Sequence, residues 1–128
     1  MPIDYRTAGT ASLAYLGDAV IELLVRERLV ESGITSPKSL NAKALTFVRA
    51  GAQAAAMERL IPHLTEEEEG AFRRGRNIGH TNTPKSATVA EYRNATGMEA
   101  LFGYLHIKGE TVRIKELFAL AYPKEEKA

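Results

Sequence analysis

The amino-acid sequence predicts an all-α protein. Apolar residues recur three and four positions apart along most of the 128 residues, and few stretches alternate apolar and polar residues as a half-buried strand would. The chain is also rich in alanine, leucine and glutamate, which favour helices. Since a chain of this length fits one domain and shows no linker or internal repeat, we expect residues 1–128 to form a single helical domain.

Glycine and proline delimit the first two predicted helices. Residues 8–32 should form one long helix or two abutting ones, and Gly33 is placed to end it. Ser36 and Pro37 are typical of an N-cap followed by proline at the first helical position, so the next helix is expected over residues 38–49. The apolar stripe predicted to face inward from the first helix consists of Leu13, Leu16, Val20, Leu23, Leu24 and Leu29.

Two shorter helices should follow. Gly51 is expected to break or bend the pattern before an alanine-rich helix over residues 52–60, which should pack closely against a neighbour. Thr65 followed by Glu68 matches a capping box, in which the side chain of each residue bonds the backbone of the other. This predicts a helix over residues 66–77.

A polar loop separates these helices from the last two. Residues 79–85 contain glycine, proline and polar side chains, and a loop after a basic helix end is a natural contact point for a ligand. The next helix should begin near Thr88 and run to about residue 107, and the last should span residues 110–122. Its predicted inward residues are Val112, Leu117, Phe118 and Ala121.

The composition limits the cellular compartment that we expect and the kinds of functional site that the chain can have. The absence of cysteine excludes disulfides, thiolate metal sites and a cysteine nucleophile, and it suits a reducing compartment. Residues 1–10 lack the apolar core of a signal peptide, and no apolar run approaches the roughly 18 residues of a membrane span. We therefore expect a cytoplasmic protein with no membrane partner.

Charge is unevenly distributed, although the formal net charge is only +1. Residues 66–69 are four consecutive acids, whereas residues 73–93 hold a single acid, Glu91, among several cations. Such a local basic stretch can bind phosphates, and it can equally be a solvated helix face. The basic residues are Arg73, Arg74, Arg76, Lys85 and Arg93.

Two acids interrupt apolar helix faces, which makes them candidates for chemistry. Asp18 follows Gly17 within an apolar segment, and Glu99 lies among small and apolar residues in the middle of a predicted helix. They could pair within the bundle as structural acids, or they could hold a metal ion. The histidines lack metal-ligand spacing, so a metal site here needs oxygen ligands, which favours Mg²⁺ or Mn²⁺ over Zn²⁺. These histidines are His63, His80 and His106.

The same segments resemble a known family. Residues 16–20 (LGDAV), with Glu22 after them, are similar to the signature segment of the ribonuclease III family. Residues 92–104 (YRNATGMEALFGY) are similar to its second catalytic helix. Residues 72–77 (FRRGRN) and 83–85 (TPK) resemble the Mini-ribonuclease III subgroup in particular. The order and spacing of these segments match the subgroup along nearly the whole chain.

The resemblance implies a helical nuclease domain that acts as a homodimer, cuts double-stranded RNA and lacks the double-stranded-RNA-binding domain of larger relatives. Asp18 and Glu99 would be both the catalytic residues and the ligands of Mg²⁺, with Mn²⁺ as the alternative ion. A dimer would set two such sites across one duplex. The residues favoured for RNA contact are Arg73, Arg74, Arg76 and Lys85.

The resemblance also implies a biological role and partners. Members of the subgroup mature 23S ribosomal RNA, so precursor 23S RNA is the expected substrate, and a ribosomal protein could present it. Larger members of the family carry two further carboxylates where this chain has Ala14 and Thr96. This departure leaves open whether one or two metal ions act. The alternatives are a non-catalytic double-stranded-RNA-binding helical dimer and a purely structural dimerisation domain.

Other polar and aromatic residues are expected to have structural or indirect roles. Glu22 lies one turn from Asp18 and also four residues before Arg26, which is a good spacing for an ion pair. We expect it to be structural or to support the site indirectly. Thr96 is expected to bond its own helix backbone rather than a metal-bound water. The tyrosines expected in the core or at a dimer interface are Tyr5, Tyr15, Tyr104 and Tyr122.

Overall fold

The computed structural model describes residues 9–78 and 87–124, and every regular element within them is helical. The predicted all-α class is therefore confirmed. The elements in chain order are α1 (Thr10–Glu31), α2 (Pro37–Val48), α3 (Ala50–Leu60), a 3-10 turn (Ile61–His63), α4 (Glu66–Arg76), α5 (Val89–Ile107) and α6 (Thr111–Ala121). None of these helices is long and apolar enough to cross a membrane.

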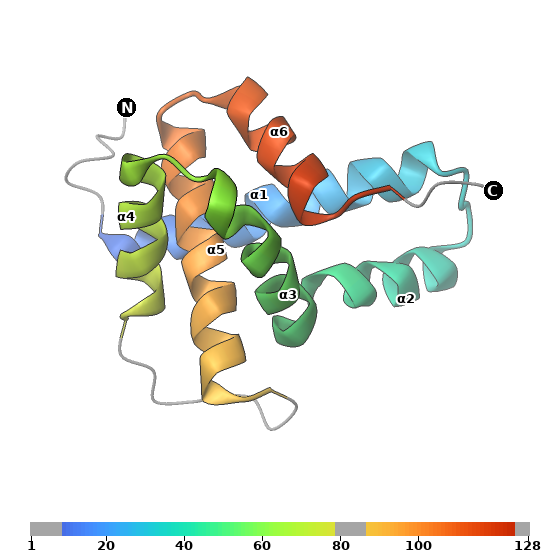
Figure 1. The fold of residues 1–128 in the computed structure, drawn as a ribbon. Helices are drawn as coiled ribbons and strands as arrows, with labels where there is room; N and C mark the ends of the chain where they lie inside the picture. The colour runs from blue at the N-terminus through green and yellow to red at the C-terminus, as the bar shows by residue number, and fades with distance from the viewer. Residues whose placement is uncertain (1–8, 79–86, 125–128) are drawn as a thin grey trace.

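Helix α5 is the centre of the fold. It contacts α1, α3, α4 and α6, and Figure 1 shows it running between α4 and α3 while α1 crosses behind it. Its middle is buried on nearly every side, with Met98, Leu101 and Phe102 fully enclosed. A helix surrounded in this way must be apolar almost all round, so a charged residue within it is costly unless it has a partner.

Reciprocal caps fix where α4 and α5 begin. Thr65 accepts a hydrogen bond from the backbone N–H of Glu68, and the Glu68 carboxylate accepts one from the backbone N–H of Thr65. Thr88 and Glu91 repeat this arrangement at the start of α5. Each box satisfies two backbone donors that a helix start leaves free, and each acid also faces the positive end of the helix dipole. The capping box predicted at Thr65 is confirmed.

The remaining boundaries confirm two predictions and correct a third. Gly33 has φ +88°, a conformation that favours glycine, two residues after the end of α1. Ser36 caps α2 with Pro37 at the first helical position. The prediction that Gly51 breaks or bends the helical pattern is wrong, since Gly51 lies inside α3. The break occurs at Arg49, whose ψ of 148° is not helical.

The predicted apolar stripes are wrong in part. Leu23 is 58% exposed, whereas Ile21 and Val25 are fully buried in α1. In α6, Val112 is 75% exposed and Ile114 is buried in its place. Both helices carry apolar residues on more than one side, so periodicity alone did not identify which side faces the core. The exposed apolar residues of α1 form a second face that the described chain does not cover.

Candidate active site

The site lies where α1 crosses α5, and the two backbones touch there. A methyl group on Gly17 would lie 1.6 Å from the carbonyl oxygen of Glu99, and one on Gly103 would lie 1.9 Å from the carbonyl oxygen of Leu13. Real Cβ atoms essentially never approach another heavy atom below 3.0 Å. The two helices can therefore meet at this distance only because both positions are glycine.

This crossing brings together the two acids that the sequence singled out. Asp18 follows Gly17 on α1, and Glu99 lies one turn before Gly103 on α5. Their carboxyl groups are in hydrogen-bonding contact. The pKa of Glu99 is raised to about 8, mainly by burial and further by the charge of Asp18 and the hydrogen bond to it. Glu99 is half-buried, whereas Asp18 is exposed to solvent.

The donor set of this pair fits a hard divalent cation. Two carboxyl groups held together supply only oxygen atoms, which Mg²⁺ and Mn²⁺ prefer. Within residues 9–78 and 87–124, no group of three or more Asp, Glu, His or Cys side chains gathers that could hold a metal ion. Mg²⁺ is commonly held by one or two carboxylates together with water and substrate phosphate, so two acids are a sufficient protein contribution.

The neighbouring polar residues have partners of their own. The Thr96 hydroxyl donates to the carbonyl of Tyr92 at 3.0 Å, as expected for a threonine within a helix. Glu22 forms an ion pair with Arg26 at 3.1 Å, which confirms the expected i,i+4 pairing. Ala14 is buried and offers no ligand atom. Among these neighbours, therefore, only Asp18 and Glu99 present carboxyl groups to each other.

The basic end of α4 packs close to this pair. A methyl group on Gly75 would lie 2.5 Å from the Ala100 side chain and 3.1 Å from the carbonyl oxygen of Thr96, so α4 touches α5 within one turn of Glu99. The three arginines around Gly75 are exposed. They are Arg73, Arg74 and Arg76.

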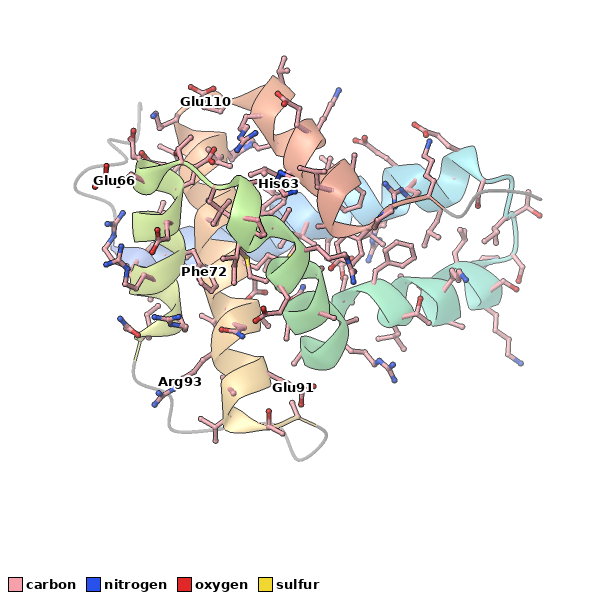
Figure 2. The ribbon with its side chains drawn as sticks, in the orientation of Figure 1. His63, Glu66, Phe72, Glu91, Arg93 and Glu110 are labelled. Carbon is pink, nitrogen blue, oxygen red and sulfur yellow. The ribbon has the colours of Figure 1, made fainter. Side chains whose placement is uncertain are left out.

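These arginines differ in how strongly their own helix holds them. Arg73 lies 3.6 Å from Glu69, and Arg76 stacks over the ring of Phe72 at 5.5 Å. Arg93, which the sequence did not assign to RNA contact, projects at the end of α5 that lies beside the end of α4 (Figure 2). Lys85 lies outside the described residues, as do the other residues of 79–85 and Tyr5.

The sequence missed the residues that bring the acids together. Gly103 was not singled out, although its spacing of four residues from Glu99 places both on one face of α5. The other tyrosines expected in the core or at an interface fall into two groups. Tyr104 and Tyr122 are buried in the core, whereas Tyr15 is 85% exposed and lies on α1 three residues before Asp18.

Comparison with known proteins gives a consistent family. The model of the Ribonuclease III domain matches residues 11–110. Mini-ribonuclease 3 of Symbiobacterium thermophilum is 49% identical over 110 residues, covering 86% of this chain and 85% of the relative. Mini-ribonuclease 3 of Enterococcus faecalis is 43% identical over 116 residues, covering 89% and 88%. A crystal structure of a Fusobacterium nucleatum protein aligns with a TM-score of 0.79 and 33% identity, covering 88% of this chain and 90% of that one.

Proposed function

The chain belongs to the ribonuclease III family, and from this membership we propose that Asp18 and Glu99 are its catalytic, metal-binding pair. The chain is an endoribonuclease of the ribonuclease III type that acts on double-stranded RNA. The family depends on divalent metal ions. Mg²⁺ is the ion we propose here, with Mn²⁺ able to replace it.

One observation carries this proposal. Two acids from distant parts of the sequence have their carboxyl groups in contact, and one of them is half-buried. Holding a carboxyl group in this environment costs stability, which a purely structural pair would have no reason to incur. Sites that bind metal or substrate do incur such costs, because the ligand compensates for them when it binds.

The roles of the two residues follow from their positions. Glu99 is fixed by the packing of α5, so its carboxylate is a rigid ligand. Asp18 is solvent-exposed and supplies the ligand nearer to an incoming RNA phosphate. A divalent cation held here supplies charge stabilisation for phosphodiester hydrolysis. The two carboxylates would hold the cation in position. Glu99, which keeps its proton in the metal-free protein, would release that proton when the cation binds.

For RNA contact we propose Arg73, Arg74, Arg76 and Lys85. The first three surround the contact between α4 and α5 and leave their guanidinium groups in solvent. A-form RNA is recognised largely through its phosphates and 2′-hydroxyls, which such exposed cations suit. Arg93 extends the same basic end from α5 (Figure 2).

We propose that two copies of the chain assemble through the outer face of α1. Tyr15, Leu23 and Val30 are strongly exposed apolar residues spaced eight and seven positions apart, which places them on one side of the helix. An apolar groove of about 250 Å³ between α1 and α2 continues this face beyond Val30. An exposed apolar surface of this kind is typical of an interface. A homodimer would also place two active sites across one duplex.

The biological substrate is the furthest step of this proposal. The resemblance of residues 72–77 to the Mini-ribonuclease III subgroup supports precursor 23S ribosomal RNA as the substrate, in the cytoplasm, with a ribosomal protein as a presenting partner. We also propose that residues 1–128 act as a single nuclease domain.

The test of the catalytic pair is Asp18→Asn, with Glu27→Gln, an exposed acid on the same helix, as the matched control. Labelled duplex and single-stranded RNA are incubated with each protein in Mg²⁺ and in chelator. Wild type and Glu27→Gln should cut the duplex only with Mg²⁺, and Asp18→Asn should cut neither RNA while remaining folded. Cleavage by Asp18→Asn at the wild-type rate would refute the assignment.

A further inference from the structure

We propose that Gly103 is a positioning residue of the active site. Together with Gly17 it sets how closely the backbones of α1 and α5 approach, and thereby how far apart the carboxylates of Asp18 and Glu99 are held. The inference rests on the proposed function, because it assumes that these two acids bind the metal ion.

The contact between the two glycines is reciprocal. A methyl group on Gly103 would lie 1.9 Å from the carbonyl oxygen of Leu13 and 3.1 Å from the backbone nitrogen of Gly17. A methyl group on Gly17 would lie 1.6 Å from the carbonyl oxygen of Glu99 and 2.8 Å from the backbone nitrogen of Gly103. All of these neighbours are backbone atoms of helices, so none can rotate away as a side chain could. An added methyl group must move one helix against the other.

The helix that has to move is α1. On its other side α5 is held by α4 through two close contacts: the Phe72 ring lies against Gly97, and Ala100 lies against Gly75 (Figure 2 labels Phe72). Helix α3 covers a further side of α5. The three atoms nearest to a methyl group on Gly103 all belong to α1. A displacement at Gly103 is therefore passed to α1 and to Asp18.

The size of that displacement matters for a metal site. Moving the Leu13 oxygen out to the 3.0 Å limit requires a shift of at least about 1 Å, and metal–ligand distances in proteins are held to within about 0.2 Å. Mg²⁺ tolerates distorted geometry poorly. A misplacement of about 1 Å in an active site can reduce the rate on the order of 10²-fold. Gly103→Ala should therefore impair metal binding and catalysis beyond any loss of stability.

Gly75→Ala is a matched control that separates a loss of metal binding from a loss of stability. Gly75 is also a helix-crossing glycine with no room for a methyl group, but it lies at the crossing of α4 with α5, where the nearest atoms belong to Thr96, Gly97 and Ala100 and none belongs to α1. Gly75→Ala inserts the same group against the same helix. It should destabilise the protein in a similar way without separating Asp18 from Glu99.

The experiment measures Mn²⁺ affinity by electron paramagnetic resonance in RNA-free wild type, Gly103→Ala, Gly75→Ala and Asp18→Asn, each shown to be folded by circular dichroism. We expect Gly103→Ala to bind Mn²⁺ at least 10-fold more weakly than wild type, and Gly75→Ala to bind it as wild type does. With duplex RNA, Gly103→Ala should lower kcat about 100-fold and change KM little, because its defect lies at the reacting group.

The remaining outcomes separate this inference from the proposed function. Wild-type Mn²⁺ affinity in Gly103→Ala, or an equal loss in Gly75→Ala, would overturn the positioning role. If Asp18→Asn also binds Mn²⁺ as wild type does, the metal assignment itself is wrong. Should Gly103→Ala be unfolded, the measurement is repeated in trimethylamine N-oxide, which favours the compact state. A variant that stays unfolded there shows that Gly103 serves the fold as a whole, which also overturns the inference.

Discussion

Glu99 and Asp18 hold their carboxyl groups in hydrogen-bonding contact across the crossing of α1 and α5. Two carboxyl groups can share a hydrogen bond only while one of them keeps its proton. Burial and the neighbouring charge of Asp18 together raise the pKa of Glu99 to about 8. The metal-free pair is therefore protonated at neutral pH, and a divalent cation has to displace that proton when it binds.

The raised pKa of Glu99 predicts how stability depends on pH in the metal-free protein. Between pH 4.5, the ordinary pKa, and about 8, the folded state keeps a proton that the unfolded state releases. The contribution of Glu99 to stability is thus fully present below pH 4.5 and is lost as pH rises through about 8. Glu99→Gln removes this loss. At pH 8.5 its free energy of unfolding should therefore exceed that of wild type by about 1 kcal/mol or more, and its Tm by about 3 °C.

The control for this measurement is Glu58→Gln, an exposed glutamate on α3 that should leave the pH dependence unchanged. Thermal unfolding is followed by circular dichroism in chelator from pH 5 to pH 8.5, and then with Mg²⁺ added. Mg²⁺ should stabilise wild type but not Glu99→Gln. Parallel pH curves for wild type and Glu99→Gln would contradict the raised pKa of Glu99.

The arginines of α4 predict a salt-dependent RNA affinity. Arg74→Gln removes one exposed cation, so duplex affinity should fall several-fold and the slope of log Kd against log salt should decrease by about 1. Fluorescence anisotropy with labelled duplex RNA in chelator measures this. Lys115→Gln, an exposed cation on α6, should leave the slope unchanged. Equal slopes for Arg74→Gln and Lys115→Gln would mean that the duplex does not contact Arg74.

The helical class and the helix ends were predictable from the sequence because local chemistry determines them. Thr65 and Glu68 bond each other's backbone within one turn, and Gly33 adopts its positive φ through its own conformational freedom. Gly51 shows the limit of this reasoning. Glycine can end a helix, but it can also be accommodated inside one, and here the chain bends at Arg49 instead.

The two acids could be singled out from the sequence, and the family resemblance implied that they share a metal ion, but the residues alone did not predict their contact. Asp18 and Glu99 stand out as acids among apolar residues, but nothing local indicates that their helices cross at that point. The crossing depends on Gly17 and Gly103, and two distant glycines become informative only in three dimensions. The same limit explains Leu23, since a helix with two apolar faces does not reveal which one lies inward.

The buried ion pair between Glu68 and Arg113 predicts a larger stability effect than the surface pairs. Glu68 is 5% exposed and accepts hydrogen bonds from Arg113 at 2.8 and 2.9 Å. Arg113→Ala would leave this carboxylate without its cation and should cost about 2–3 kcal/mol at pH 7 by urea denaturation. The hydrogen bond from Arg113 lowers the pKa of Glu68, so the difference from wild type should shrink as pH falls below 4.5 through that lowered pKa.

The control for the buried pair is Arg26→Ala, which breaks the exposed pair with Glu22. Exposed pairs contribute little because water screens them, so this variant should cost no more than about 0.5 kcal/mol. Equal costs for the two variants would mean that Glu68 finds another partner or water once Arg113 is removed.

The exposed face of α1 predicts the oligomeric state. Tyr15 is 85% exposed in the single chain, and an aromatic residue at the centre of an interface contributes about 2–4 kcal/mol. Tyr15→Glu should therefore shift sedimentation-equilibrium profiles from dimer to monomer at micromolar concentration, and it should slow the paired cutting of both strands more than the first cut. Val112→Glu places the same charge on a similarly exposed apolar position of α6 and should leave the dimer intact. A wild-type chain that sediments as a monomer would refute the homodimer. A Tyr15→Glu variant that remains dimeric would show that this face of α1 is not the interface.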